Sequence, residues 1–72
     1  MDNSDILEFV IFYCEIVAKK INKTPSEVFR LLNKNGRIIT SYLVPKYEIL
    51  RHKNKDYVAD EIIKLMKDKN II

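Results

Sequence analysis

The chain has 72 residues, a net charge of +3 and 47% hydrophobic residues, with only one Gly, one Cys and one His. A chain of this length forms one domain, residues 1–72, and buries only about 60% of the surface that its unfolded form exposes. One cysteine excludes an intrachain disulfide, and one cysteine with one histidine excludes a structural zinc site. We therefore expect a partner chain to supply additional stability.

Neither a signal peptide nor a membrane-spanning segment is indicated. Residues 2–5 are polar and acidic, where a signal peptide is cationic. The apolar run from Phe9 to Cys14 is too short to cross a bilayer. The single cysteine is typical of a reducing compartment. We expect a cytoplasmic protein that does not associate with membranes.

The segment Ile6–Ile21 is the most hydrophobic stretch of the chain, and its charges are spaced as on one face of a helix. Glu8, Glu15 and Lys19 fall on a narrow stripe, which leaves most of the circumference apolar. We expect the other segments to pack around this helix on nearly all sides, or a second chain to cover what they leave exposed.

A second helix is predicted to begin at Pro25. The Thr24 hydroxyl caps it, Pro25 takes the first helical position, and Glu27 reaches back to the cap amide. Asn35–Gly36 is predicted to end it, because glycine adopts the left-handed conformation readily.

Two short helices are predicted between residues 37 and 52, divided at Pro45 because proline disfavours α geometry at Val44. A lone strand there would have no partner in this chain. A last helix is predicted at residues 56–69, and its apolar stripe is Tyr57, Val58, Ile62, Leu65 and Met66. The expected fold is all-α: a single compact bundle of four to five helices around the hydrophobic N-terminal helix.

No pattern of residues indicates catalysis or a cofactor. Cys14 lies in the most hydrophobic helix, where burial raises a thiol pKa, and His52 lies in a charged connection. Asp60 and Glu61 point about 100° apart on a helix and cannot share a proton. Gly36 alone makes no glycine-rich phosphate loop. We expect a protein without enzymatic activity, metal, cofactor or small-molecule substrate.

The surplus of apolar residues and the four tyrosines favour protein binding. Aromatic side chains with a polar tip are enriched at protein interfaces. We expect self-association, binding of another protein, or both. The predicted binding residues are Phe12, Tyr13, Tyr42, Tyr47 and Tyr57.

Residues 17–32 also have the pattern of a helix-turn-helix, which makes DNA binding the alternative. Ala18 is the small residue that the first helix of this motif needs, and Asn22 is expected to take the left-handed turn conformation. Glu27 counts against this alternative, because its charge would face phosphates. The residues predicted to contact DNA are Lys23, Thr24, Ser26, Arg30, Arg51, Lys53 and Lys55.

Five short motifs are spread over nearly the whole chain: Leu7-Glu-Phe-Val, Ala18-Lys-Lys, Glu27-Val28, Tyr47-x-x-Leu50 and Tyr57-Val58-x-Asp60-x-Ile62. In these motifs the chain resembles a family of short bacterial proteins of unknown function, often encoded beside a predicted ADP-ribosyltransferase-like protein. The resemblance implies an antitoxin-like or accessory binding protein whose partner is encoded in the same operon. The family usually has His directly after the leucine that corresponds to Leu50. This chain has Arg51 there, so no role of a histidine is carried over.

Overall fold

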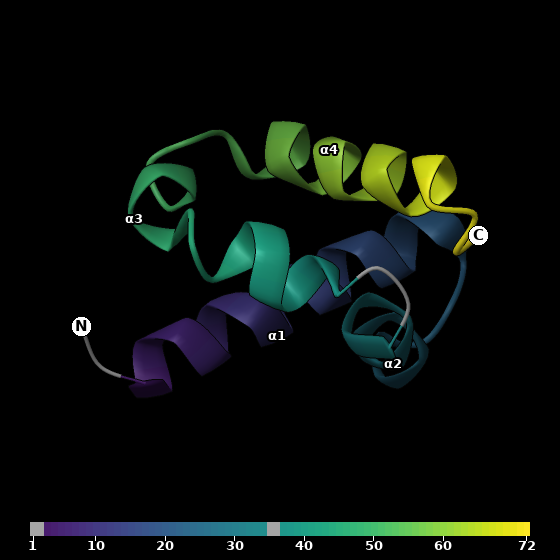
Figure 1. Ribbon diagram of the computed structural model, residues 1–72, viewed down its shortest axis with the longest axis horizontal. Coiled ribbons are helices and arrows are strands. Elements are labelled where there is room, and N and C mark those ends of the chain that lie inside the picture. The colour runs from purple at the N-terminus through teal and green to yellow at the C-terminus, as the bar shows by residue number, and fades with distance from the viewer. Residues whose placement is uncertain (1–2, 35–36) are drawn as a thin grey trace.

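The structure is a computed structural model that describes residues 3–34 and 37–72. The helices in these ranges are α1 (Asn3–Ile21), α2 (Pro25–Lys34), the π-helix η1 (Ile39–Leu43), α3 (Tyr47–Leu50) and α4 (Lys55–Asp68). The described residues contain no strand, so the predicted all-α class is confirmed (Figure 1). The predicted end of the second helix, Asn35–Gly36, lies outside the described residues.

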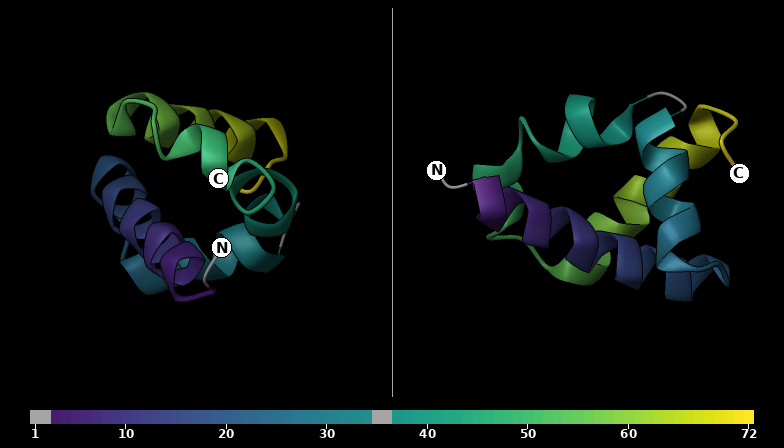
Figure 2. Two further views of the ribbon diagram at one scale, coloured as in Figure 1. Left: turned by 90° about the vertical axis from the view of Figure 1, so that its left-hand side faces the viewer. Right: turned by 90° about the horizontal axis from the view of Figure 1, so that it is seen from below.

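The helices form one bundle in which α1 is the shared element. α1 packs against both α2 and α4, and α2 also packs against η1. The two views of Figure 2 show α1, α2, the segment from η1 to α3, and α4 arranged around a common interior. Every helix contributes to one apolar core. Its fully buried large side chains are Val17, Val28, Leu32, Ile38, Leu43, Val58, Ile62 and Met66.

α1 is buried on one side only. Val10, Cys14 and Val17 lie in the core, whereas Leu7 is 55% exposed and Ile11 is 44% exposed. Of the two expected alternatives, coverage of the helix by the other segments of this chain is therefore wrong, and coverage by a second chain stays a prediction. The helices that pack against α1 are chiefly α2 and α4, and together they leave the side of α1 that carries Leu7 and Ile11 partly exposed.

The turn between α1 and α2 follows the sequence closely. Asn22 adopts the predicted left-handed conformation (φ 58°), and the Lys23 N–H donates to the Ala18 carbonyl at 2.9 Å, as in a Schellman motif. The predicted capping box is also present. The Glu27 N–H donates to Thr24 Oγ1 at 3.2 Å, and the Thr24 N–H donates to Glu27 Oε1 at 3.3 Å.

The segment before Pro45 is a π-helix, in which the Val44 N–H donates to the Ile39 carbonyl five residues back at 2.9 Å. Val44 has right-handed helical angles (φ −68°, ψ −50°), so the predicted departure from α geometry at this residue is wrong. The division at Pro45 is nevertheless present, because proline has no N–H with which to continue the helical hydrogen bonding. α3 begins two residues later, at Tyr47.

Both ends of α4 have side-chain or backbone caps. Asn54 Oδ1 accepts from the Asp56 N–H at 2.9 Å and from the next N–H at 3.2 Å, a cap that the sequence prediction missed. At the other end Asn70 is left-handed (φ 59°), and the Ile71 N–H donates to the Met66 carbonyl at 2.8 Å. This motif places Ile71 against the core of its own chain.

Candidate protein-binding groove

An apolar groove of about 400 Å³ lies between α1 and α2. It is lined by Leu7, Ile11 and Cys14 from α1 and by Pro25, Ser26 and Phe29 from α2. Leu7, Ile11 and Cys14 follow each other at intervals of four and three residues, which places them on one face of α1. Phe29 lies one turn after Pro25 and is 40% exposed. The large apolar side chains that the groove presents to solvent are therefore Leu7 and Ile11 from α1 and Phe29 from α2.

Local hydrogen bonds at the start of α2 hold the second wall of the groove in place. The Thr24 hydroxyl donates to Glu27 Oε1 at 3.1 Å, in addition to the two capping bonds. Hydrogen bonds from the Thr24 backbone and side chain lower the pKa of Glu27, so the capping carboxylate resists protonation as the pH falls. This cap fixes the first turn of α2, which carries Pro25 and Ser26.

Cys14 contributes to the groove lining from within the core. Its side chain is buried, and it is a free cysteine. Burial raises the pKa of the thiol to about 11, and the neighbouring negative charge of Glu15 adds to the effect. At neutral pH the thiol is therefore protonated and behaves as a small apolar group.

The predicted binding residues Tyr13 and Tyr47 lie in the core instead of at the surface, with exposed fractions of 3% and 8%. The Phe9 ring packs edge-on against both, with centroid distances of 5.0 Å to Tyr13 and 4.9 Å to Tyr47. This aromatic packing joins α1 to α3 and buries both side chains almost completely, so they form no exposed rim, and their role in binding stays a prediction. Phe12 is 45% exposed, and the centroid of its ring lies 5.2 Å from that of Tyr13.

The predicted residues Tyr42 and Tyr57 line a second hollow of about 290 Å³. Its other lining residues are Lys46, Ile49, Leu50, Lys53 and Glu61. Tyr42 is half-buried beneath the Lys46 ammonium group, which lies 5.2 Å from the ring centroid. Tyr57 is 55% exposed and lies outside the buried stripe of α4, where Ala59 is buried instead. The structure thus brings Tyr42 and Tyr57 together in a hollow whose lining excludes Phe12.

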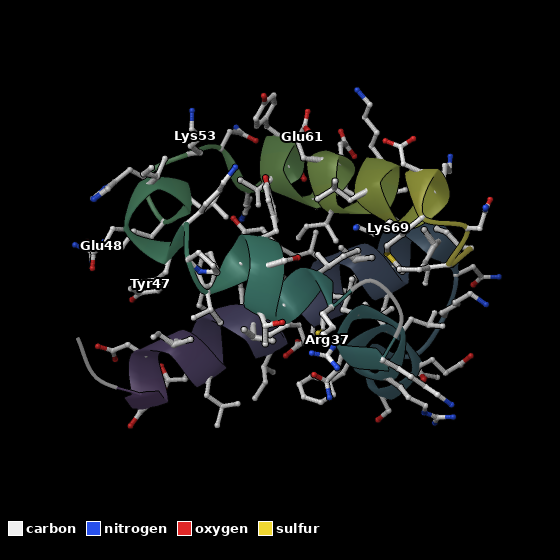
Figure 3. All side chains as sticks on the ribbon, viewed as in Figure 1. Arg37, Tyr47, Glu48, Lys53, Glu61 and Lys69 are labelled. Carbon is white, nitrogen blue, oxygen red and sulfur yellow. The ribbon has the colours of Figure 1, made fainter. Side chains whose placement is uncertain are left out.

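The residues predicted to contact DNA are all exposed but fall into two groups. Lys23, Thr24, Ser26 and Arg30 lie on the α1–α2 turn and α2, whereas Arg51, Lys53 and Lys55 lie between α3 and the start of α4. α3 and the connection after it lie toward the end of the molecule away from α2, and Figure 3 shows Lys53 there. Arg51 is engaged locally, since it pairs with Glu48 at 3.4 Å and lies over the Tyr47 ring. The structure does not bring the two groups into one surface.

Sequence reasoning missed Leu7, Ile11, Pro25 and Phe29 as candidate site residues. A signal for Phe29 was available, because it falls outside the inward face that the neighbouring leucines of α2 define. Leu7 and Ile11 carry the equivalent signal, since they are spaced by four residues and adjoin the polar stripe of α1. Both signals become interpretable only when the position of α2 against α1 is known.

The fold and the groove define a small all-α protein with an exposed apolar groove between two of its helices. Among the described residues no group of His, Cys, Asp and Glu is placed to hold a metal ion, and no described helix has the length and apolarity to span a membrane. The chain belongs to the DUF3791 family, described as a protein of unknown function, which matches residues 8–69. This confirms the expected membership of a family of uncharacterised proteins. Comparisons with curated proteins and with solved structures gave no match.

Proposed function

We propose that this chain is a non-catalytic protein-binding module whose partner docks in the groove between α1 and α2. The observation that carries the proposal is the exposure of Leu7, Ile11 and Phe29 along one groove. Apolar surface in contact with water is unfavourable, and contiguous apolar surface of this kind marks interaction sites. A protonated Cys14 thiol in the groove lining also suits a passive docking surface better than a nucleophile.

The resemblance described above supplies the first partner to test. It implies an antitoxin-like or accessory role toward a protein encoded beside the chain, of the ADP-ribosyltransferase-like type. Self-association through the same groove is the other form of protein binding that we expected from the apolar surplus. Both forms place a protein surface against Ile11 and Phe29.

Co-purification tests the proposal. A tagged chain is co-expressed with the product of the adjacent gene, and the complex is measured for the wild type and for Ile11→Asp and Phe29→Asp. The expected result is a complex that both substitutions abolish. Ile49→Asp is the matched control, because Ile49 is 60% exposed yet lies outside this groove. Circular dichroism verifies that each variant is folded. A complex that survives both groove substitutions, or is lost equally with Ile49→Asp, contradicts the proposal.

DNA binding through residues 17–32 is the second candidate function. It is supported by the left-handed Asn22 and by the exposure of Lys23 and Arg30 beside the turn. A DNA complex loses affinity steeply as salt rises, because phosphate contacts release counterions. Replacing Lys23 or Arg30 by alanine would then weaken binding of duplex DNA and reduce its salt dependence. A DNA affinity that changes neither with rising salt nor with these alanine substitutions excludes this candidate.

A further inference from the structure

The α1 wall of the groove carries only negative charge over most of its length. From Asn3 to Ala18 the chain contains Asp5, Glu8 and Glu15 but no Lys or Arg, although the net charge of the whole chain is +3. All three carboxylates are exposed. The surface beside the groove is therefore opposite in sign to the protein as a whole.

Two of these carboxylates border the groove directly. Glu8 and Glu15 lie three residues before and four residues after Ile11, and residues at these spacings are neighbours on a helix surface. Within the described part of the chain, neither carboxylate forms an ion pair with a basic side chain. The α1 rim thus offers two solvated carboxylates without a directly paired basic side chain, and Lys19 follows Glu15 by four residues on the same stripe.

The α2 rim is uncharged at the corresponding positions. The residues three before and four after Phe29 are Ser26 and Asn33. Arg30 is turned by about 100° from Phe29 around the helix, but it follows the lining residue Ser26 by four residues and so borders the outer side of this rim. Arg37 lies beyond the C-terminal end of α2, whereas the groove is lined by the first half of that helix. An occupant therefore meets an apolar floor, an acidic rim on α1, and a mostly neutral rim on α2 that has Arg30 on its outer side.

A second copy of this chain suits such a surface poorly. Symmetric packing through the exposed side of α1 would bring six carboxylates together, from Asp5, Glu8 and Glu15 of each copy. Lys19 of each copy would offset only two of them, because Lys20 is already paired with Asp56 and Asp60 at 3.8 and 3.4 Å. Like charges brought into contact oppose association.

We infer that the groove receives an amphipathic helix of another protein, with Lys or Arg flanking its apolar anchors. This inference rests on the proposed function and names the chemistry of the partner. Both walls are helices, and the described residues offer no strand edge for main-chain pairing, so a helix that inserts side chains is the fitting ligand. Its anchors fill the space between Ile11 and Phe29, and its cations lie against Glu8 and Glu15.

Two synthetic peptides test the charge of the occupant. Both are stapled helices with the same leucines at positions i, i+4 and i+7, and they differ only in carrying Lys or Glu at the flanking positions. Fluorescence anisotropy with the full chain measures their affinities at low and at high salt. Two exposed ion pairs together amount to about a tenfold preference for the lysine peptide at low salt, which shrinks as salt rises.

Substitutions on the rim separate the charge inference from the binding function itself. Glu8→Lys with Glu15→Lys is expected to reverse the preference, whereas Asp68→Lys, which changes an exposed carboxylate at the end of α4, leaves it unchanged. Equal binding of both peptides, abolished by Ile11→Asp, overturns the charge inference and keeps the proposed function. Binding of neither peptide overturns the inference, while co-purification judges the function independently. A dimer in light scattering that Ile11→Asp dissociates assigns the groove to a second copy and also overturns it.

Discussion

The reactivity of the Cys14 thiol measures how completely this one side chain of the groove lining is buried. Burial raises its pKa from 9.0 to about 11, with a smaller contribution from Glu15. At about pH 8 an ordinary thiol is roughly one-tenth thiolate, whereas Cys14 is about one-thousandth thiolate. Since the thiolate is the reactive species, we predict that Cys14 reacts with a disulfide reagent at least a hundredfold (order of magnitude) more slowly in the folded chain than in the urea-unfolded chain.

The same pKa shift predicts that the protein loses stability at alkaline pH. The folded pKa lies above the unfolded one, so the contribution of Cys14 is complete below about pH 9. Between about pH 9 and pH 11 the unfolded chain gives up the proton first, which favours unfolding. A shift of about two units corresponds to a loss of roughly 2–3 kcal/mol in the free energy of unfolding.

Urea unfolding followed by circular dichroism, at intervals from about pH 8 to pH 11, measures this loss. Cys14→Ala is the control, because it removes the titrating group and keeps a small apolar side chain. Tyr13 and Tyr42 have pKa values that burial raises, but both are present in both proteins, so their contributions cancel. A wild type and variant with the same pH dependence, together with rapid thiol labelling of the folded wild type, would refute the buried environment of Cys14.

Three further predictions concern the elements that support the groove. Thr24→Ala removes the capping box and is expected to lower the free energy of unfolding by about 1 kcal/mol in urea titrations, while the pKa of Glu27 returns toward its ordinary value in an NMR titration. Leu32→Ala truncates a fully buried side chain and should cost about 2–5 kcal/mol by chemical denaturation, whereas Ile49→Ala should change stability by less than about 0.5 kcal/mol. Asn54→Ala should lower stability by about 1 kcal/mol and Asn54→Gly by only a few tenths (order of magnitude), and equal losses in thermal unfolding would contradict the cap.

The local features of this fold were predictable because each depends on a few neighbouring residues. Asn22 tolerates the left-handed turn, and Thr24 and Glu27 satisfy the first N–H groups of α2 from three residues apart. The all-α class followed from hydrophobic spacing in the same way. Asn54 was missed as a cap although its residue type was suitable, because the basic connection around it gave no hydrophobic pattern to mark the start of α4.

The groove was not predictable, because it depends on where one helix ends against another. The pattern of α1 defines which side chains are apolar, but not that Val17 is fully buried while Leu7 stays exposed. The burial of two of the tyrosines was not predictable for the same reason. Tyr13 and Tyr47 have the chemistry of interface residues, but the structure buries both and packs both against Phe9.

The contact between the Phe9 and Tyr47 rings also couples the groove-lining stretch of α1 to α3. α3 has only four residues, too few to persist as an isolated helix, so its order depends on the packing of Tyr47 against Phe9 and on the burial of Leu50. Phe9 lies on the same stretch of α1 as Ile11, but about 160° around the helix from it. A ligand that steadies this stretch from the groove side will therefore also slow amide hydrogen exchange in residues 47–50, on a part of the protein that it never touches.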